Sequence, residues 1–188
     1  MPASNSPQQD DRLVIGVTGR IGAGKTSVSR HLSNAHGFQY VRYSQVLSDW
    51  RANDPESKAH LQAIGWEVMS GGMQTELNKR LIGQLQPRGD AVVDGLRHPI
   101  DFESLQSSFA SHFRLLFIEC PEAIRWQRLR SRLPTLEEFR RADSHPVEQQ
   151  IESLRERAFA VVSNDSSLQD IYSKVDLLLH EIRQGGQS

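Results

Sequence analysis

The sequence predicts an α/β fold in which helices cover both faces of a five-stranded, mainly parallel sheet, giving three α/β/α layers. Short unbroken apolar segments alternate with longer segments of helical character along the 188 residues, and a glycine-rich loop joins the first apolar segment to the first helical one. Strands that are apolar on both faces are typical of parallel sheets, whose crossover connections place helices on each side. The carboxyl ends of such strands meet at one edge, where ligands bind.

The first half of the chain contains two predicted strands and four predicted helices. Leu13–Val17 is an apolar run and is expected to be a strand, and Phe38–Val41 is expected to be a short second strand. The helices are expected at Thr26–Ala35, Ser44–Trp50, Lys58–Met69 and Met73–Leu85, and the glycine pair Gly71 and Gly72 separates the last two. Residues from about 44 to 86 therefore form a helical insertion between strands. The polar residues 1–11 are expected to be a disordered tail.

The second half contains three predicted strands and four predicted helices. The strands are Ala91–Asp94, which Gly95 ends, Phe113–Glu119 and Phe159–Ser163. The helices are Pro99–Ser107, Glu122–Arg132, Val147–Arg157 and Leu168–Ile182. A polar segment at about 133–143 lies between two of these helices and is expected to act as a lid. We expect one domain at 12–184, with a second short tail at 185–188.

Residues 19–26 read GRIGAGKT, which fits the phosphate-binding pattern G-x-x-x-x-G-K-[ST]. The pattern follows a predicted strand and opens a predicted helix, and this order predicts a P-loop NTPase fold. Backbone N–H groups of such a loop bind phosphate, while Lys25 is expected to contact the β- and γ-phosphates of ATP and Thr26 to ligate Mg²⁺. The expected nucleotide-binding residues are Gly19, Arg20, Ile21, Gly22, Ala23, Gly24, Lys25, Thr26, Ser27 and, after the last strand where a loop can meet the adenine, Asn164.

Two polar residues at the third strand are candidates for catalysis. Asp94 can act on Mg²⁺ directly or through water, and Arg97 is expected to point into the cleft. An Asp-Gly turn followed by a solvated arginine explains the same residues, because turns favour this dipeptide. Their position at the carboxyl end of a strand favours the functional interpretation.

Arginines recur along the predicted helix at Glu122–Arg132. Arg125, Arg128 and Arg132 have the spacing i, i+3, i+7 and would share one helix face. Such a stripe can neutralise a transferring phosphoryl group, and a solvated helix face explains it equally well. Arg128 and Arg132 are the catalytic candidates from this helix.

Composition excludes several classes of function. The net charge is −1 with mixed signs, which gives no electrostatic footprint for nucleic acid, and no apolar run approaches membrane-spanning length. Cys120 is the only cysteine, so the chain has no intrachain disulfide and fits a reducing compartment. Residues 1–11 do not resemble a secretory leader, and cytoplasm is the expected location. His98 and His145 each precede proline and are expected in loops rather than as metal ligands.

The order of the segments GRIGAGKT, SQVLSDW, LQAIGWEVMSGG, VVDGLRHPIDFESL, FIECPEAIRWQRLRSR, LPTLEEFRRADSHPVEQQI and VVSNDSSLQDIYSKV carries a family resemblance. From about Leu13 to Ile182 the chain resembles P-loop nucleoside monophosphate kinases. It is close to the deoxynucleoside monophosphate kinase and dephospho-CoA kinase-like branch, and it is also similar to the P-loop domain of some deoxycytidylate deaminases. The resemblance implies that Lys25 and Thr26 serve ATP and magnesium, that Arg97 holds the acceptor phosphate and that the arginines at 125–132 border the lid.

Two departures from these relatives refine the expectation. Dephospho-CoA kinases have an acidic residue at the end of the second strand, where this chain has Arg42, Tyr43 and Ser44, and one cysteine cannot supply the zinc ligands of a deaminase. A phosphate acceptor needs positive charge rather than a general base. We therefore expect ATP- and Mg²⁺-dependent transfer to a nucleoside monophosphate, including a deoxynucleotide, with Arg42, Ser44, Arg51 and Arg97 binding the acceptor.

Two other functions stay open at the level of sequence. One is a nucleotide-binding regulatory or sensor protein that retains the phosphate-binding loop without transfer, because the segment from Ser48 to Gly72 matches nucleotide kinases poorly. The other is a hydroxyl-directed kinase such as a dephospho-CoA kinase, which would need Asp49 or Asp94 as its base.

Overall fold

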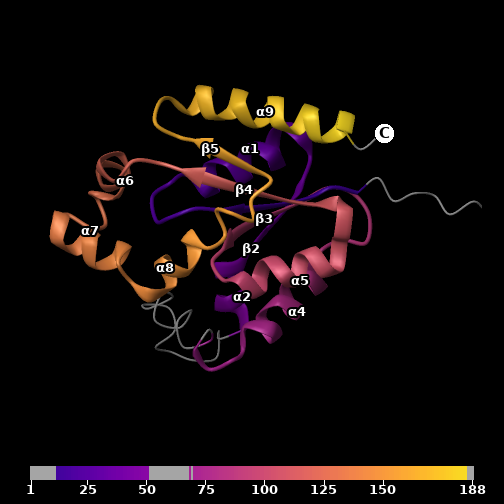
Figure 1. Cartoon of the computed structure of the whole chain (residues 1–188), viewed down its shortest axis with the longest axis horizontal. Helices are drawn as coiled ribbons and strands as arrows, with labels where there is room; N and C mark the ends of the chain where they lie inside the picture. The colour runs from indigo at the N-terminus through magenta and orange to yellow at the C-terminus, as the bar shows by residue number, and fades with distance from the viewer. Residues whose placement is uncertain (1–11, 51–67, 69, 186–188) are drawn as a thin grey trace, which may run out of the picture.

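A computed structural model describes residues 12–50, 68 and 70–185 (Figure 1). The tail at 1–11, the candidate acceptor residue Arg51 and the predicted helix Lys58–Met69, apart from Val68, lie outside the described residues, as does the end of the chain at 186–188.

Within the described residues, the strands form a five-stranded parallel sheet of order β2-β3-β1-β4-β5. They are β1 (Val14–Thr18), β2 (Gln39–Arg42), β3 (Ala91–Leu96), β4 (Phe113–Glu119) and β5 (Ala160–Ser163). Neighbouring strands are parallel in every pair, with Val14 of β1 opposite Ala91 on one side and Phe113 on the other. β1 lies at the centre of the sheet, between β3 and β4. The loops that follow β1 and β3 are therefore neighbours at the carboxyl edge of the sheet. This order places the glycine loop beside Asp94.

Helices cover both faces of the sheet, which confirms the three predicted layers (Figure 1). One face carries α1 (Lys25–His36) and α9 (Leu168–Gly185), and the other carries α2 (Tyr43–Trp50), α4 (Gln74–Gln84) and α5 (Pro99–Phe109). Side chains of a strand point alternately to the two faces, so Val92 packs under α1 and α9 while Ala91 and Val93 pack under the other helices. Two separate apolar cores hold the sheet between them.

Three short helices, α6 (Glu122–Leu129), α7 (Leu136–Asp143) and α8 (Pro146–Glu152), lie together at the carboxyl edge of the sheet (Figure 1). The predicted helix Glu122–Arg132 is therefore too long, and the segment 133–143 is mostly helical rather than an extended polar excursion. Pro134 disfavours helical backbone at Leu133, which separates α6 from α7. Thr135 and Glu138 then start α7 with reciprocal hydrogen bonds between their side chains and backbone N–H groups.

Several other boundaries differ from the sequence prediction, and those of β3 and α8 bear on the site. β3 continues through Gly95 to Leu96, because Gly95 takes a φ of 91° and the pairing with β1 shifts at that point. Asp94 therefore lies within the strand, and Arg97 is the first residue beyond it. α8 begins at Pro146 and ends at Glu152, five residues before the predicted end at Arg157.

The two proline-preceding histidines lie in loops, as predicted, and each caps the helix that follows it. His98 Nδ1 accepts a hydrogen bond from the Ile100 N–H at the start of α5, and His145 Nδ1 accepts one from the Val147 N–H at the start of α8. None of the helices within the described ranges has the length and apolar character needed to cross a membrane.

Candidate phosphate-binding site

The loop between β1 and α1 has the backbone conformation that its glycines permit. Gly19, Gly22 and Gly24 have φ values of 140°, 77° and 102°, a region that other residues rarely adopt. A Cβ at Gly24 would overlap Asn164 Nδ2, and that amide group donates a hydrogen bond of 2.7 Å to the Ala23 carbonyl. The side chain of Asn164, directly after β5, therefore packs against the loop and supports it.

Lys25 folds back over this loop. Its Nζ donates hydrogen bonds to the Gly19 and Arg20 carbonyls at 2.6 and 3.0 Å. Burial, assisted by the nearby guanidinium of Arg97, lowers the pKa of Lys25 to about 8, while the carboxylates Glu148 and Asp94 oppose this shift. The buried Lys25 ammonium group is poorly solvated, so a bound anion would stabilise its charge.

Asp94 joins the loop helix to the second and third strands. Its Oδ2 accepts hydrogen bonds from Thr26 Oγ1 at 2.9 Å and from Tyr40 Oη at 2.8 Å, and its side chain is 2% exposed. Burial, together with the smaller effect of the nearby Asp94 carboxylate, raises the pKa of the Tyr40 phenol to about 12. The adjacent hydroxyl and carboxylate oxygens are hard ligands of the kind that Mg²⁺ prefers, so the pair fits a magnesium site.

A cavity of about 280 Å³ opens directly beside this pair. Its wall includes Lys25 and Thr26 from the loop, and Arg42 and Arg97 from the ends of β2 and β3. Further polar and apolar lining comes from Ile21, Tyr43, Ser44, Leu47, Gln74, Leu77, Asp94, Gly95, Asp101, Val147 and Glu148. The structure thus brings the predicted acceptor residues Arg42, Ser44 and Arg97 next to the predicted phosphate loop.

Glu148 is a fully buried carboxylate at the wall of this cavity. Its Oε2 accepts a hydrogen bond of 2.8 Å from the Ile21 N–H, and its Oε1 lies 3.3 Å from Arg97 Nη1. Oε1 has no hydrogen-bond partner among the described residues, although it is buried. A buried charge needs compensation, so Arg97 is fixed at the cavity wall by the carboxylate that it neutralises.

A second buried carboxylate holds the acceptor side of the cavity together. Asp101 accepts hydrogen bonds from the Gln74 and Asn78 side chains on one oxygen, and from the backbone N–H groups of Arg97 and His98 on the other. Asp101 is 1% exposed. All of its strong acceptor positions are used for positioning β3, α4 and α5, which suits a structural role better than proton transfer.

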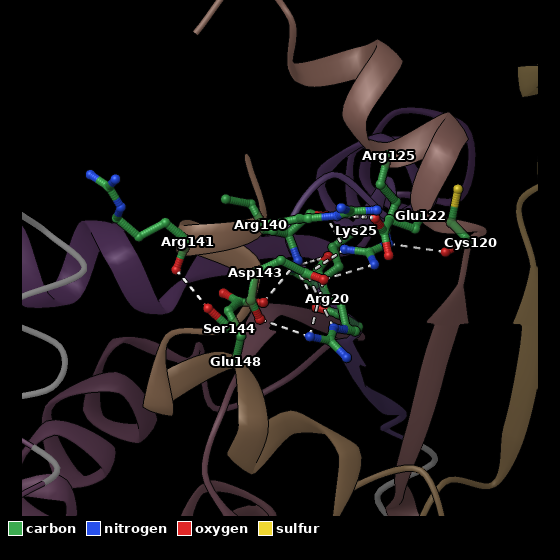
Figure 2. Close-up of polar contacts among 12 residues, drawn as sticks. Arg20, Lys25, Cys120, Glu122, Arg125, Arg140, Arg141, Asp143, Ser144 and Glu148 are labelled. Atoms are coloured by element: carbon green, nitrogen blue, oxygen red, sulfur yellow. Dashed lines mark hydrogen bonds and ion pairs between the residues drawn. The ribbon is translucent and has the colours of Figure 1, made fainter. Parts of the chain in front are cut away.

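The segment at 133–143 is attached to the phosphate loop through Asp143, at the end of α7 (Figure 2). Arg125 of α6 binds both carboxylate oxygens of Asp143, and Arg20 of the loop approaches the same carboxylate from the other side, with Nε at 3.1 Å. Arg125 also donates to the Cys120 and Ile21 carbonyls. With a side chain only 6% exposed and every contact internal, Arg125 braces α7 against the loop.

Replacing Asp143 with alanine is expected to lower the free energy of unfolding by about 3 kcal/mol, because it leaves the buried Arg125 guanidinium without its counter-charge. Equilibrium denaturation measures the loss. Glu137→Ala on the same helix removes a partner of Arg141 that is 84% exposed, and should change stability by less than about 0.5 kcal/mol. Equal effects of the two substitutions would contradict the bracing role.

The three arginines at 125, 128 and 132 do not lie together on one helix face. Arg128 reaches beneath the loop, with Nη2 3.2 Å from Asn164 Oδ1 and Nη1 3.3 Å from Cys120 Sγ. Arg132 lies beyond the end of α6 and is exposed, so it does not share the face of Arg125 and Arg128. Asn164 is itself buried at 1% exposure, with its amide engaged by the loop and by Arg128.

Sequence reasoning missed three residues that the fold brings to this site. Tyr40, Asp143 and Glu148 contact Asp94, Arg20 and Ile21 across 54, 123 and 127 residues of sequence. Asp143 and Glu148 stand in a polar stretch with many charges, where no spacing singles them out. Tyr40, in the second strand and two residues before Arg42, was the one visible signal.

The fold and part of the sequence are similar to known proteins. A gluconokinase from Sinorhizobium meliloti shares the fold with a TM-score of 0.63 and 16% identity over 92% of this chain and 94% of that one. A shikimate kinase from Acinetobacter baumannii, in complex with shikimate, gives a TM-score of 0.61 and 16% identity over 92% and 95%. An Archaeoglobus fulgidus UPF0200/UPF0201 protein is 29% identical over 100 residues, which are 50% of this chain and 31% of that protein, so the match spans about a third of the relative.

Residues 15–149 match the AAA domain family. This range begins in β1, contains the phosphate loop, Asp94, the cavity arginines and the lid, and ends directly after Glu148. Because the match covers most of the 188 residues, the chain belongs to the AAA domain family.

Proposed function

We propose that this protein transfers the γ-phosphoryl group of ATP to the phosphate of a nucleoside monophosphate, including a deoxynucleotide. The observation that carries the proposal is the cavity that Lys25 and Thr26 share with Arg42 and Arg97. Donor-binding and acceptor-binding cations thus line one space, as in-line transfer between two phosphates requires. The similarity in fold to small-molecule kinases supports phosphoryl transfer in general.

The chemistry follows from the side chains around the cavity. An oxygen of the acceptor phosphate attacks the γ-phosphorus while the bond to the β,γ-bridging oxygen breaks, which leaves ADP and a nucleoside diphosphate. Lys25 moves from the Gly19 and Arg20 carbonyls to the phosphates, and loop N–H groups hold the β-phosphate. Thr26 and Asp94 would hold Mg²⁺, which neutralises charge on the β- and γ-phosphates when bound. Arg97 and Arg42 orient the acceptor.

A hydroxyl acceptor is less well supported, because it needs an available carboxylate as general base. Asp49 is exposed on α2, accepts a hydrogen bond from Gln45 and does not line the cavity. Asp94 already accepts two hydroxyl hydrogen bonds on one oxygen. Glu148 is held by Ile21 and faces Arg97. The acceptor side of the cavity instead presents the positive charges of Arg42 and Arg97, which suit a phosphate acceptor.

The direct test incubates the protein with ATP, Mg²⁺ and each ribo- and deoxynucleoside monophosphate in turn, and separates the products by chromatography. We expect ADP and one matching diphosphate in equal amounts for a preferred acceptor. ADP without any diphosphate would refute transfer to a monophosphate. Tight ATP binding with no product from any acceptor would favour the sensor function instead.

Arg97→Ala should raise the KM for the acceptor by about 10- to 100-fold with little change in ATP affinity, because a lost charged hydrogen bond to a phosphate costs about 1.5–3 kcal/mol. Steady-state kinetics with each substrate varied measures both constants. The removal also leaves Glu148 unpaired, so Arg97→Ala/Glu148→Gln separates lost binding from a disturbed fold. Arg157→Ala, which removes an exposed pair with Glu103, is the matched control. An unchanged acceptor KM in Arg97→Ala would remove Arg97 from the acceptor site.

A further inference from the structure

A cluster of two histidines and an aspartate lies between α1 and α9, on the face of the sheet away from α4 and α5. His31 Nε2 and His36 Nε2 lie 2.6 and 2.7 Å from the same oxygen, Asp176 Oδ1. All three potential ligand atoms lie within 4.8 Å of one another. None of these residues lines the cavity beside the phosphate loop.

The cluster is held in place by its surroundings. His31 stacks on Tyr172 of α9, with ring centroids 4.2 Å apart and planes 3° from parallel, and its own ring meets His36 edge to face at 5.5 Å. The two histidine side chains are 16% and 25% exposed, and that of Asp176 is 43% exposed. An ion can therefore enter from solvent, while two of the three side chains are largely fixed.

We infer that His31, His36 and Asp176 form a binding site for a divalent transition-metal ion, with Zn²⁺ the best fit. Two imidazole nitrogens and one carboxylate oxygen are a typical zinc ligand set, whereas Mg²⁺ and Ca²⁺ prefer oxygen ligands throughout. Zinc binds such atoms at about 2.0–2.2 Å in a tetrahedral arrangement, so neighbouring ligand atoms stand about 3.3 Å apart. The present nitrogen–oxygen distances reach this value by small side-chain rotations. A water molecule completes the fourth position.

The charge of the cluster fits the same ion. The cluster carries one formal negative charge, and His36 ends α1, where the helix dipole favours a cation. In the present contacts each Nε2 donates its hydrogen to Asp176 Oδ1, so metal binding requires the tautomer with the proton on Nδ1, which frees Nε2 to bind the metal. Ligands from two helices make the ion a crosslink between α1 and α9. His31 and His36 lie about 9 and 16 Å along α1 from Lys25 at 1.5 Å per residue, and neither lines the cavity beside the phosphate loop, so the site is separate from the phosphate site.

The test measures metal binding by tag-free protein that has been treated with a chelator and dialysed. Titration with Zn²⁺ alone should show one saturable site per chain, and Co²⁺ alone should give the visible absorption of a tetrahedral complex. Zn²⁺ should also raise the thermal midpoint, because it binds the folded state. His36→Ala and Asp176→Asn should each weaken Zn²⁺ binding by about tenfold or more and remove the Co²⁺ spectrum.

Two controls locate the ion. His112→Ala removes an exposed histidine that is not part of the cluster, and Asp94→Asn alters the candidate magnesium site, so both variants should bind Zn²⁺ as the unmodified protein does. Asp176→Asn keeps an oxygen that can accept from both histidines, and its circular dichroism should match that of the unmodified protein. Unchanged Zn²⁺ affinity in both ligand variants, or no saturable binding by the unmodified protein, would overturn the inference.

Discussion

Lys25→Met is expected to lower kcat about 10³-fold or more, because the proposed reaction loses the cation that offsets charge on the β- and γ-phosphates. Methionine has a similar length and no charge, so the loop helix should remain intact. Burial depresses the pKa of Lys25 in the folded protein to about 8, which means that its charge destabilises the ligand-free fold below that pH. The variant should therefore have a thermal midpoint at pH 7 no lower than that of the unmodified protein.

The same pKa predicts a pH dependence of nucleotide binding. Below about pH 8 the free site carries the ammonium form and binds ATP well, whereas above this pH it must first take up a proton. Bound phosphate raises the lysine pKa, so the Kd for ATP should increase up to tenfold per pH unit above pH 8. Titration calorimetry between pH 7 and 9.5 measures this slope, and Lys25→Met should show a flatter profile. Full turnover by the variant would end the proposed role of Lys25.

Asp94→Asn is expected to lower kcat by about 10²- to 10³-fold, because it removes the only charge of the proposed magnesium site. The asparagine oxygen still accepts from Thr26 and Tyr40, so folding should be preserved. The concentration of Mg²⁺ that gives half-maximal activity should rise, which a merely structural change would not produce. An activity loss without any change in Mg²⁺ dependence would argue against the metal assignment.

Two milder substitutions complete this series. Tyr40→Phe removes one hydrogen bond to Asp94 and should cost less than about tenfold in kcat, since the carboxylate charge remains. Asp49→Asn should leave activity unchanged, because Asp49 is exposed outside the cavity. A large loss in Asp49→Asn would support the hydroxyl-directed alternative instead.

The central strands could be predicted from sequence because β1, β3 and β4 are short, mostly apolar runs that both faces of a parallel sheet bury. Val92 and Val93 pack into different cores, yet both must be apolar, so the whole run stands out. The residue at which a strand ends could not be predicted in the same way. β3 extends past Gly95 because pairing with β1 continues through a register shift, and that pairing depends on a partner 78 residues away.

The lid shows where local spacing fails. Arg125, Arg128 and Arg132 have helical spacing, but α6 ends at Leu129, and Arg125 turns into a buried pair with Asp143. Spacing describes which side chains share a helix face and says nothing of what packs against that face. The exposed Arg132 and the internal Arg125 therefore look alike in sequence and differ completely in surroundings.

The sequence by itself determined the α/β layers and the phosphate loop, because both depend on local properties: apolar runs, glycines with positive φ and a lysine at a helix start. The tertiary structure alone decided which distant side chains complete the site. Tyr40, Asp143 and Glu148 reach the loop region only through strand order and lid packing, as does the His31, His36 and Asp176 cluster through the contact of α1 with α9. Buried charged groups pair with groups that are close in space. When two such groups are more than a hundred residues apart in sequence, no regular spacing in the chain indicates the pair.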